Sequence, residues 1–443
     1  MKKILIVFVL GVFCAGNLTG QVNDSNTPLH LLQPDYPHAY GKADVKSVKA
    51  DLDRIFTYLD AVTPVQLVDK TSGKTLPAAS PGTNAAFAKG DYRLFSYEWG
   101  VTYSGMLAVS AVSGDKKYAG YTQKRVDFLA ELAGHYRKTS PEVQKSSPVA
   151  SLLHPHALDD AGALCMAMIK RMGSGNEKQL RPVIDHFIDF IMHKEYRLPD
   201  GTFARNRPLK NTVWLDDMFM SVPAIAYMGK LTGEQRYFDE ATRQVKQFSK
   251  RMFDQKKNIF IHGWLEESAV QPKYHWGRAN GWAIMAITEL LSLLPEEHND
   301  RAEIMELYRK HVQGLAALQS GKGFWHQLLD KSDTYLETSA TAIFTYSITR
   351  GINEGWLDYE AFGPMVLLAW EALATQITPE GKITGTCVGT GMGFDPAFYY
   401  YRPVNPFAAH SYGPMLLAGA EIMKLLNHHK YGINETAVQF IQQ

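Results

Sequence analysis

Two Leu-Asp-Asp triplets each stand at the beginning of a long segment with helical spacing. Asp159 and Asp160 belong to the first triplet, and Asp216 and Asp217 follow about 57 residues later, an interval typical of a repeated pair of helices. When consecutive repeats pack side by side, such carboxyl groups meet at one end of a helical barrel. Carboxyl groups that share a cleft can donate and accept protons. The spacing therefore indicates acid/base chemistry of the kind used on sugars.

The same four acids also have a structural interpretation. A carboxylate at the beginning of a helix accepts hydrogen bonds from free backbone N–H groups and interacts favourably with the helix dipole. For any single one of the four, capping explains the residue as well as catalysis does. We expect two of them to serve only as caps.

A cationic and aromatic group stands at the beginning of another helical segment. Trp276, Arg278 and Trp282 lie within the run 275–282. Arginine offers a fork for a carboxylate, and indole rings offer flat faces for a sugar ring. His262 is a further candidate contact, although a backbone carbonyl group can equally satisfy a loop histidine. Trp99 is another candidate, and ordinary packing explains it equally well.

These residues belong to a unit that recurs along the chain. Each unit has a helix rich in small residues, a turn, a more charged amphipathic helix such as 235–253, and a loop containing glycine and aromatic residues. Short strand-like pieces such as 258–262 suit hairpins between units. The six units begin near Tyr97, His156, Val213, Gly277, Leu336 and His410.

Six helix hairpins that close on themselves make an all-α fold, the (α/α)6 barrel or six-hairpin toroid. The helices rich in small residues form the inner ring and the charged helices form the outer ring. Because parallel inner helices begin at the same rim, the fold predicts that the candidate residues meet there. No Pro/Ser-rich linker divides the chain, so we expect one domain.

The composition excludes several classes of function. The chain has 443 residues, 45% of them hydrophobic, and 46 basic residues nearly balance 45 acidic ones. No charge excess points to nucleic acid or to a membrane surface, so we expect a small or oligomeric neutral or acidic ligand. Metal, nucleotide and serine-hydrolase motifs do not occur in a convincing context, so we expect no metal and no cofactor. The oligomeric state stays open.

The first residues have the layout of a secretory signal peptide, with two lysines, an apolar run over 4–13 and small residues after it. We therefore expect residues 1–20 to be a signal peptide and residues 21–443 to form the domain, in the periplasm or secreted. Cys14 follows the bulky Phe13, which disfavours a lipoprotein. Cys165 and Cys387 then remain, and they allow at most one disulfide.

The motifs resemble those of the unsaturated rhamnogalacturonyl hydrolases, glycoside hydrolase family 105, and more distantly those of the unsaturated glucuronyl hydrolases of family 88. Two departures are small: Ala161 replaces a frequent cysteine and Ser411 a usual glycine. The resemblance covers about residues 97–426. Its blocks are 158–162, 214–220, 262–264, 276–282, 323–327, 335–339, 387–390 and 410–414.

The resemblance implies a role for each matching residue. Asp216 matches the general acid/base and Asp160 matches the second carboxylate of the catalytic site. Trp276 and Arg278 match residues that hold the uronate. The remaining expected substrate contacts are His262, Trp282, Arg205 in a loop that some relatives use, and Trp99.

The resemblance also implies the reaction, which removes the terminal 4,5-unsaturated uronic acid from oligosaccharides made by lyases, in particular those of rhamnogalacturonan. Protonation of C4 develops positive charge at C5, water adds there, and the resulting hemiketal opens and expels the remaining sugar. We expect Asp216 to supply the proton. A neighbouring carboxylate such as Asp160 would raise the pKa of Asp216 and keep it protonated near neutral pH.

Three alternatives stay open at this point. A conventional inverting glycosidase would need Asp160 and Asp216 on either side of a scissile bond, with room for a water molecule between them. A sugar epimerase would use paired histidines, for which His262 and His410 are candidates. A sugar-binding toroid without catalysis would need the aromatic residues and the arginine alone.

Overall fold

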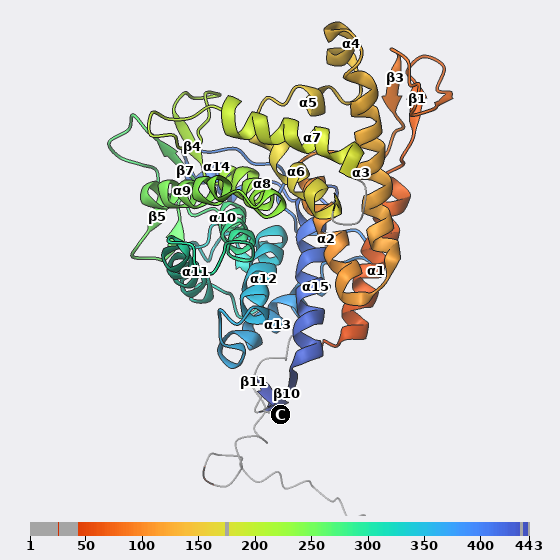
Figure 1. Ribbon diagram of the computed structural model, residues 1–443. Helices are drawn as coiled ribbons and strands as arrows, with labels where there is room; N and C mark the ends of the chain where they lie inside the picture. Colours follow the sequence, from red (N-terminus) through yellow and green to blue (C-terminus); the bar gives the residue numbers. More distant parts are fainter. Residues whose placement is uncertain (1–24, 26–42, 173–176, 435–436, 442–443) are drawn as a thin grey trace, which may run out of the picture.

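The computed structural model of the chain describes residue 25 and residues 43–172, 177–434 and 437–441. Within these ranges six helices form a closed inner ring, in which each helix packs against the next and the last packs against the first. In Figure 1 this ring runs through α2, α6, α8, α10, α12 and α15. The predicted all-α (α/α)6 toroid is confirmed.

Small residues let neighbouring inner helices approach closely. A Cβ atom added to Gly162 would lie 1.7 Å from the carbonyl oxygen of Met220, and one added to Gly413 would lie 2.6 Å from the backbone nitrogen of Thr102. Both positions therefore require glycine. The inner helices are α2 Tyr97–Ser113, α6 Leu158–Met172, α8 Asp216–Thr232, α10 Gly277–Leu291, α12 Thr338–Asn353 and α15 Tyr412–His428.

A second helix covers the outside of each inner helix. The predicted amphipathic segment 235–253 is α9, which packs against α8. The sixth pair was not predicted, because its outer member is α1, which comes from the beginning of the chain and packs against α15. The outer helices are α1 Val45–Val62, α3 Lys116–Tyr136, α7 Glu177–Asp189, α9 Gln235–Met252, α11 Arg301–Ala316 and α13 Tyr359–Ala374.

Short hairpins join the units, as the sequence predicts. Strand β4 (Thr212–Trp214) pairs antiparallel with β7 (Gly263–Leu265), and the backbone nitrogen of Leu215 donates to the carbonyl oxygen of His262 at 2.9 Å. This pairing holds the beginning of α8 beside the loop that carries His262. The other inter-unit pairs are β5 (Phe253–Asp254) with β6 (Ile259–Phe260), and β8 (Trp325–His326) with β9 (Leu336–Glu337).

Two further sheets were not predicted. Strands β1 (Leu67–Asp69), β2 (Thr75–Leu76) and β3 (Ala85–Phe87) form a small sheet beside α3, and β10 (Lys430–Asn434) pairs with β11 (Ala437–Ile441). The β10–β11 pair depends on tertiary contacts, since Phe440 packs against Tyr359 and His429. The remaining short elements are α4 Pro141–Ser146, α5 Ala150–Leu153, η2 Phe190–Lys194, α14 Pro396–Tyr400 and η3 Ala409–Ser411.

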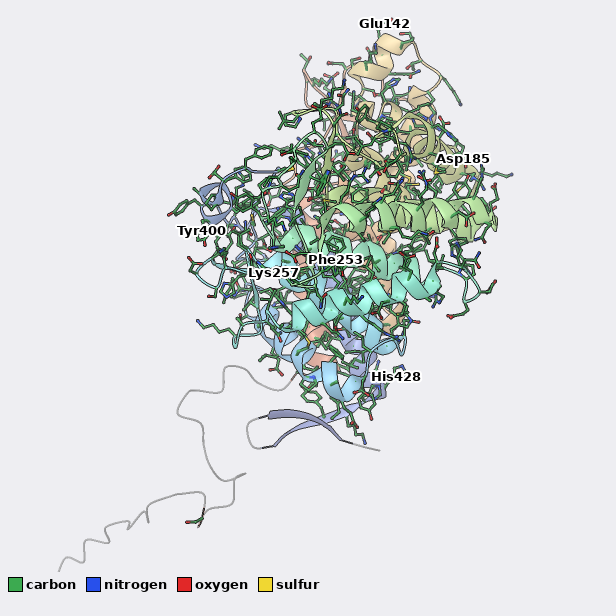
Figure 2. All side chains as sticks on the ribbon, turned by 90° about the vertical axis from the view of Figure 1, so that its left-hand side faces the viewer. Glu142, Asp185, Phe253, Lys257, Tyr400 and His428 are labelled. Atoms are coloured by element: carbon green, nitrogen blue, oxygen red, sulfur yellow. The ribbon has the colours of Figure 1, made fainter. Side chains whose placement is uncertain are left out.

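The two ends of the toroid are well separated. Figure 2 places Glu142 of α4 at one end of the molecule and His428, the last residue of α15, at the other. Cys165 and Cys387 are buried and unpaired, so the possible disulfide is absent. The predicted signal peptide and Cys14 lie outside the described residues. No helix in the described ranges is both long and apolar enough to span a bilayer.

Candidate active site

The beginnings of the inner helices converge on one phenol group. Tyr97 opens α2, and burial raises the pKa of its hydroxyl well above the ordinary value. The charges of Glu98, Asp159 and Asp216 raise this pKa further, while Arg278 lowers it. These residues open or adjoin α2, α6, α8 and α10, so the predicted convergence at a single rim is confirmed.

A hydrogen-bonded chain orients Asp216, the first residue of α8. Its Oδ2 atom lies 3.0 Å from Nε2 of His262, and Nδ1 of His262 lies 2.7 Å from the hydroxyl of Tyr399. An ionised carboxylate can only accept hydrogen bonds, so Nε2 of His262 carries the hydrogen. The backbone N–H of Gly393 donates to the same hydroxyl at 3.0 Å, and this hydroxyl can itself donate to the carbonyl oxygen of Gly393 at 3.4 Å. Nδ1 of His262 can therefore carry a hydrogen as well, which gives the ring a positive charge beside Asp216. Asp216 and His262 are thus brought together.

The charge state of Asp216 differs from the one that the sequence predicts. Burial raises the pKa of this carboxyl, but the hydrogen bond and charge of His262, followed by the charges of Arg205 and Arg278, outweigh burial. The net effect is a pKa below the ordinary value. A raised pKa supplied by Asp160 was therefore wrong for the protein without its substrate.

Arg205 joins carboxylates from two helices. Its guanidinium donates to both oxygens of Asp217, at 2.6 and 3.0 Å, and approaches Asp159 at 3.3 Å. The guanidinium also lies over the ring of Trp214, 4.2 Å from its centroid. Asp217 is buried with 3% of its side chain exposed. The paired guanidinium is what makes its burial tolerable.

Asp159 is a carboxyl group whose pKa lies near neutral pH. Burial raises its pKa, Arg205 opposes this, and the charges of Asp217, Asp216 and Asp160 raise the pKa again, to about 7. A third of the side chain remains exposed. The sequence analysis named Asp159 as one of four candidates but did not select it.

Asp160 has a different environment. Its Oδ2 atom accepts a hydrogen bond from the backbone N–H of His156 at 2.8 Å, and so it holds the chain that enters α6. This is close to the capping interpretation of the sequence. Asp160 also lines the cavity beside Asp159. Its role as the second catalytic carboxylate stays a prediction.

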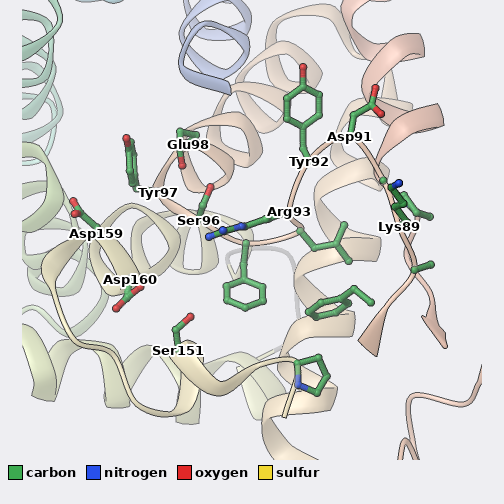
Figure 3. Close-up of a pocket in the computed structure, with 17 residues that line it drawn as sticks. Lys89, Asp91, Tyr92, Arg93, Ser96, Tyr97, Glu98, Ser151, Asp159 and Asp160 are labelled. Atoms are coloured by element: carbon green, nitrogen blue, oxygen red, sulfur yellow. The ribbon is translucent and has the colours of Figure 1, made fainter. Parts of the chain in front are cut away.

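A cavity of about 690 Å³ opens at this rim. Figure 3 shows Asp159 and Tyr97 close together at one side, with Asp160 and Ser151 below them and Arg93 extending across the middle. The cavity therefore gives an elongated ligand access to Asp159. Among the described residues, no group of three or more His, Cys, Asp or Glu side chains is placed to hold a metal ion.

Arg278 is buried beneath the rim and is already engaged with the protein. Its guanidinium donates to the carbonyl oxygens of Cys387 and Val388, at 2.8 and 2.7 Å, and to the hydroxyl of Ser339 at 3.2 Å. It also lies over Trp276, 4.6 Å from the ring centroid. Arg278 thus supplies positive charge near Asp216 and anchors the 387–388 loop, while direct contact with a uronate stays a prediction.

The three predicted sugar platforms are also buried. Trp99, Trp276 and Trp282 are each about 1% exposed. The ring of Trp99 stacks on Tyr92 at 4.8 Å, and that of Trp282 stacks on Phe219 at 4.9 Å. The structure therefore shows these indoles as supports of the rim, and their contact with a sugar stays a prediction.

Sequence reasoning missed two residues of the site. Tyr399 lies more than a hundred residues from His262, and no local motif marks it. Glu195 follows the π-helix η2, and burial, with Asp217 and Asp159 adding to it, raises its pKa to about 7 although the backbone N–H of Tyr196 and the charge of Arg205 oppose this. The π-helix is a feature often found at functional sites, but it is not visible in sequence.

Comparison with known families agrees with this architecture. Residues 74–426 match the family described as Glycosyl Hydrolase Family 88. The chain belongs to this family. The relationship predicted from the motifs is confirmed, and the match includes the inner helices from α2 to α12, most of α15 and the residues around Asp216.

Two proteins that are similar to this chain are named unsaturated 3S-rhamnoglycuronyl hydrolases. The protein from Formosa agariphila is 26% identical over 252 residues, which cover 54% of this chain and 65% of the relative. The protein from an Alteromonas species is 30% identical over 217 residues, which cover 47% of this chain and 51% of the relative. The alignments thus span less than two thirds of the length of either relative.

Solved structures share the fold. A possible member of the GH105 family from Klebsiella pneumoniae aligns with a TM-score of 0.69 at 22% identity, over 92% of this chain and 100% of that structure. At this identity the likeness establishes the fold and leaves the reaction to be argued from the site.

Proposed function

We propose that this protein is a hydrolase that removes the terminal 4,5-unsaturated uronic acid from oligosaccharides generated by lyases. The observation that carries the proposal is the set of three carboxyl groups, Asp159, Asp216 and Asp217, gathered around Arg205. Their pKa values are driven apart, with that of Asp159 raised to about 7 and that of Asp216 lowered. Neighbouring carboxyl groups with separated pKa values are typical of acid/base sites.

Asp216 transfers the proton in this proposal. Its position is fixed by His262, so its carboxyl group can be aimed at C4 of the substrate. The uronate adds a negative charge to the cleft, which offsets the charges that lower the pKa of Asp216. The pKa of Asp216 then rises, and the proton initially held on Asp159 becomes available to it.

The reaction follows from this arrangement. Transfer of the proton to C4 leaves positive charge at C5 and the ring oxygen, which the surrounding carboxylates stabilise. The ionised Asp216 then takes a proton from the water molecule that adds to C5. The hemiketal opens, the double bond is gone, and the remaining sugar is released.

Asp159 replaces Asp160 as the partner of Asp216 in this scheme. Both residues lie in the first turn of α6, but Asp159 faces Arg205 and Asp217 whereas Asp160 holds the backbone of His156. A conventional inverting mechanism receives less support, because it needs two carboxyl groups on opposite faces of a scissile bond. Here Asp159 and Asp217 share the Arg205 guanidinium, whose charge also acts on Asp216.

The names of the relatives support a rhamnose-containing substrate. Two relatives are named unsaturated 3S-rhamnoglycuronyl hydrolases and a third, from Bacillus subtilis, is named an unsaturated rhamnogalacturonyl hydrolase. We propose unsaturated rhamnogalacturonan oligosaccharides as the first substrates to test. The measurement is the loss of the ultraviolet absorbance of the conjugated C4=C5 bond. Wild-type protein should abolish this absorbance, whereas cleavage of saturated glycans with no loss on any unsaturated uronide would reject the proposal.

We further propose that the protein is exported to the periplasm or secreted, on the basis of its N-terminal 20 residues. Expression of the full chain followed by cell fractionation and N-terminal sequencing tests this. The expected result is an exported protein beginning near residue 21. An uncleaved protein in the cytoplasm would contradict the proposal.

A further inference from the structure

Two exposed cations line the same cavity as Asp159. Lys89 and Arg93 precede α2, and both belong to the wall of the 690 Å³ cavity. Within the described part of the chain, neither side chain forms a hydrogen bond or an ion pair. They differ in this respect from Arg205 and Arg278, which are engaged with the protein.

Arg93 lies where two cavities meet. Besides the cavity that contains Asp159, it lines a neighbouring cavity of about 400 Å³ together with Gly389, Phe407 and His410. In Figure 3 the guanidinium of Arg93 is directed toward the side that holds Ser96 and Asp159, and Lys89 lies on the opposite side. A ligand that extends from Asp159 across the middle of this cavity therefore passes Arg93.

The other charged residues of this wall are all acidic. Asp91, Glu98, Asp159 and Asp160 all line the cavity of Arg93. Such a wall repels an anionic oligosaccharide unless a cation compensates. Because Arg93 has an uncommitted planar fork of donors, it can bind a carboxylate or a sulfate ester through two parallel hydrogen bonds.

We propose that Arg93 binds a second anionic group, a carboxylate or a sulfate ester, on a sugar that follows the unsaturated uronate. Lys89, farther from Asp159, adds to the binding of substrates that extend past Arg93. Arg93 is thereby a specificity-determining residue that selects oligosaccharides with more than one charge. This inference rests on the proposed function and extends it to the sugars beyond the cleaved bond.

The test compares two kinds of substrate on Arg93→Met and on wild-type protein. One substrate is an unsaturated disaccharide whose second sugar is neutral. The others are unsaturated oligosaccharides with a second uronate or with a sulfate ester. Arg93→Met should raise KM for the doubly charged substrates about tenfold or more, leave kcat within about twofold, and leave both constants for the disaccharide within about twofold, since one lost charge-assisted contact is worth roughly 1.5–3 kcal/mol.

Matched variants distinguish the charge of Arg93 from the shape of its side chain, and a local effect from a change in the net charge of the protein. Arg93→Lys keeps the charge and should recover part of the KM. Lys89→Met should raise KM less than Arg93→Met does. Lys124→Met removes an exposed charge on α3, away from the cavity wall, and should leave every KM unchanged. Thermal unfolding of all variants checks that they are folded.

The outcomes separate the two proposals. An equal rise in KM for the disaccharide and the doubly charged substrates, or no rise at all, would overturn the role of Arg93 and leave the proposed function intact. A response to the second uronate but not to the sulfate ester, or the reverse, identifies which anion the site takes. Failure of wild-type protein to consume any unsaturated substrate would overturn both.

Discussion

The two ends of the inner ring differ in how their buried charges are balanced. At the end where the inner helices stop, Glu289 is 1% exposed and accepts from Lys170 at 3.1 Å, from Tyr227 at 2.9 Å and from Tyr346 at 2.7 Å. Arg350 and Glu421 form a second ion pair at 2.6 Å, and the charge of Arg350 also acts on Glu289. Two cations thus face two carboxylates there, and each acid has hydrogen-bond donors.

The end where the inner helices begin has an excess of acid. Asp159 and Asp217 share Arg205, Asp216 is paired with His262, and the charges of Arg205 and Arg278 also act on Asp216. In consequence the pKa of Asp159 is raised to about 7, whereas Glu289 has a pKa below its ordinary value because Lys170 and its other donors outweigh burial. The paired charges around Glu289 stabilise the ring. The excess of carboxyl groups at the other end raises the pKa of Asp159 and so leaves a proton available for catalysis.

Removing the carboxylate of Asp216 should have the largest effect. Asp216→Asn is expected to lower kcat by about 10²–10⁴-fold, because a group that transfers a proton in the transition state contributes that much. The midpoint of thermal unfolding should change little. Steady-state kinetics with an unsaturated oligosaccharide checks the effect, and Asp300→Asn on the outer surface is the control. Full activity in Asp216→Asn would place the proton transfer elsewhere.

A substitution of Glu289, at the end where the inner helices stop, should lower the stability of the fold and leave catalysis unchanged. Glu289→Ala leaves Lys170 buried without its partner, so the free energy of unfolding should fall by about 3–5 kcal/mol. Glu289→Gln, which keeps the hydrogen-bond acceptor, should lose less. Denaturant unfolding measures both, and kcat of the folded fraction should be unchanged. A large fall in kcat would show that the two ends are not independent.

The same pair predicts how stability depends on pH. Since the folded pKa of Glu289 lies below the unfolded value, its contribution to stability is present above the unfolded pKa of about 4.5 and is lost as the pH falls through the folded pKa. Glu289→Gln should therefore show a weaker loss of stability in acid than wild type. Equal acid sensitivity of the two proteins would argue that other carboxylates dominate.

The pH profile of catalysis tests whether the proton held by Asp159 takes part in the reaction. In wild type, kcat/KM should fall as the pH rises through about 7, because the raised pKa of Asp159 is where the free site loses that proton. In Asp159→Asn the proton of Asp159 is absent, and the pKa of Asp216, the proposed donor, is lowered. The fall should move to lower pH. A profile that is unchanged by the substitution would remove Asp159 from the proton transfer.

The smallest effect is expected for the neighbour of Asp159. Asp160→Ala removes the acceptor for the backbone of His156 and should cost about 0.5–2 kcal/mol of stability, as the loss of a helix cap does. Its kcat should stay within a few-fold of wild type. Asp159→Ala is the matched comparison, and an equal or larger loss of kcat in Asp160→Ala would restore Asp160 as the catalytic partner.

The fold was largely predictable because repetition and patterning are local properties of the sequence. Each predicted unit opening lies close to the beginning of an inner helix, and 235–253 is an outer helix. The pairing of α1 with α15 was not predictable in this way, because it joins the two ends of the chain. The β10–β11 pair was missed for a similar reason, since its contact through Phe440 depends on α13.

The site was predicted to the level of the rim but not to the level of individual atoms. The resemblance assigned Asp216 and His262 to the same site, as proton donor and substrate contact, and the structure places the two side chains in contact. The sequence could not distinguish Asp159 from Asp160, because one residue along a helix turns a side chain by about 100°. The sequence also could not show that the guanidinium of Arg278 donates hydrogen bonds to the carbonyl oxygens of Cys387 and Val388.

The most direct test of the account is to run the reaction in heavy water and analyse the released uronic acid by NMR spectroscopy and mass spectrometry. Protonation of the double bond by Asp216 predicts one deuterium bound to C4 and no remaining C4=C5 bond. Release of a uronic acid that keeps its double bond and carries no deuterium at C4 would mean that the glycosidic bond is cleaved conventionally, and would contradict the account.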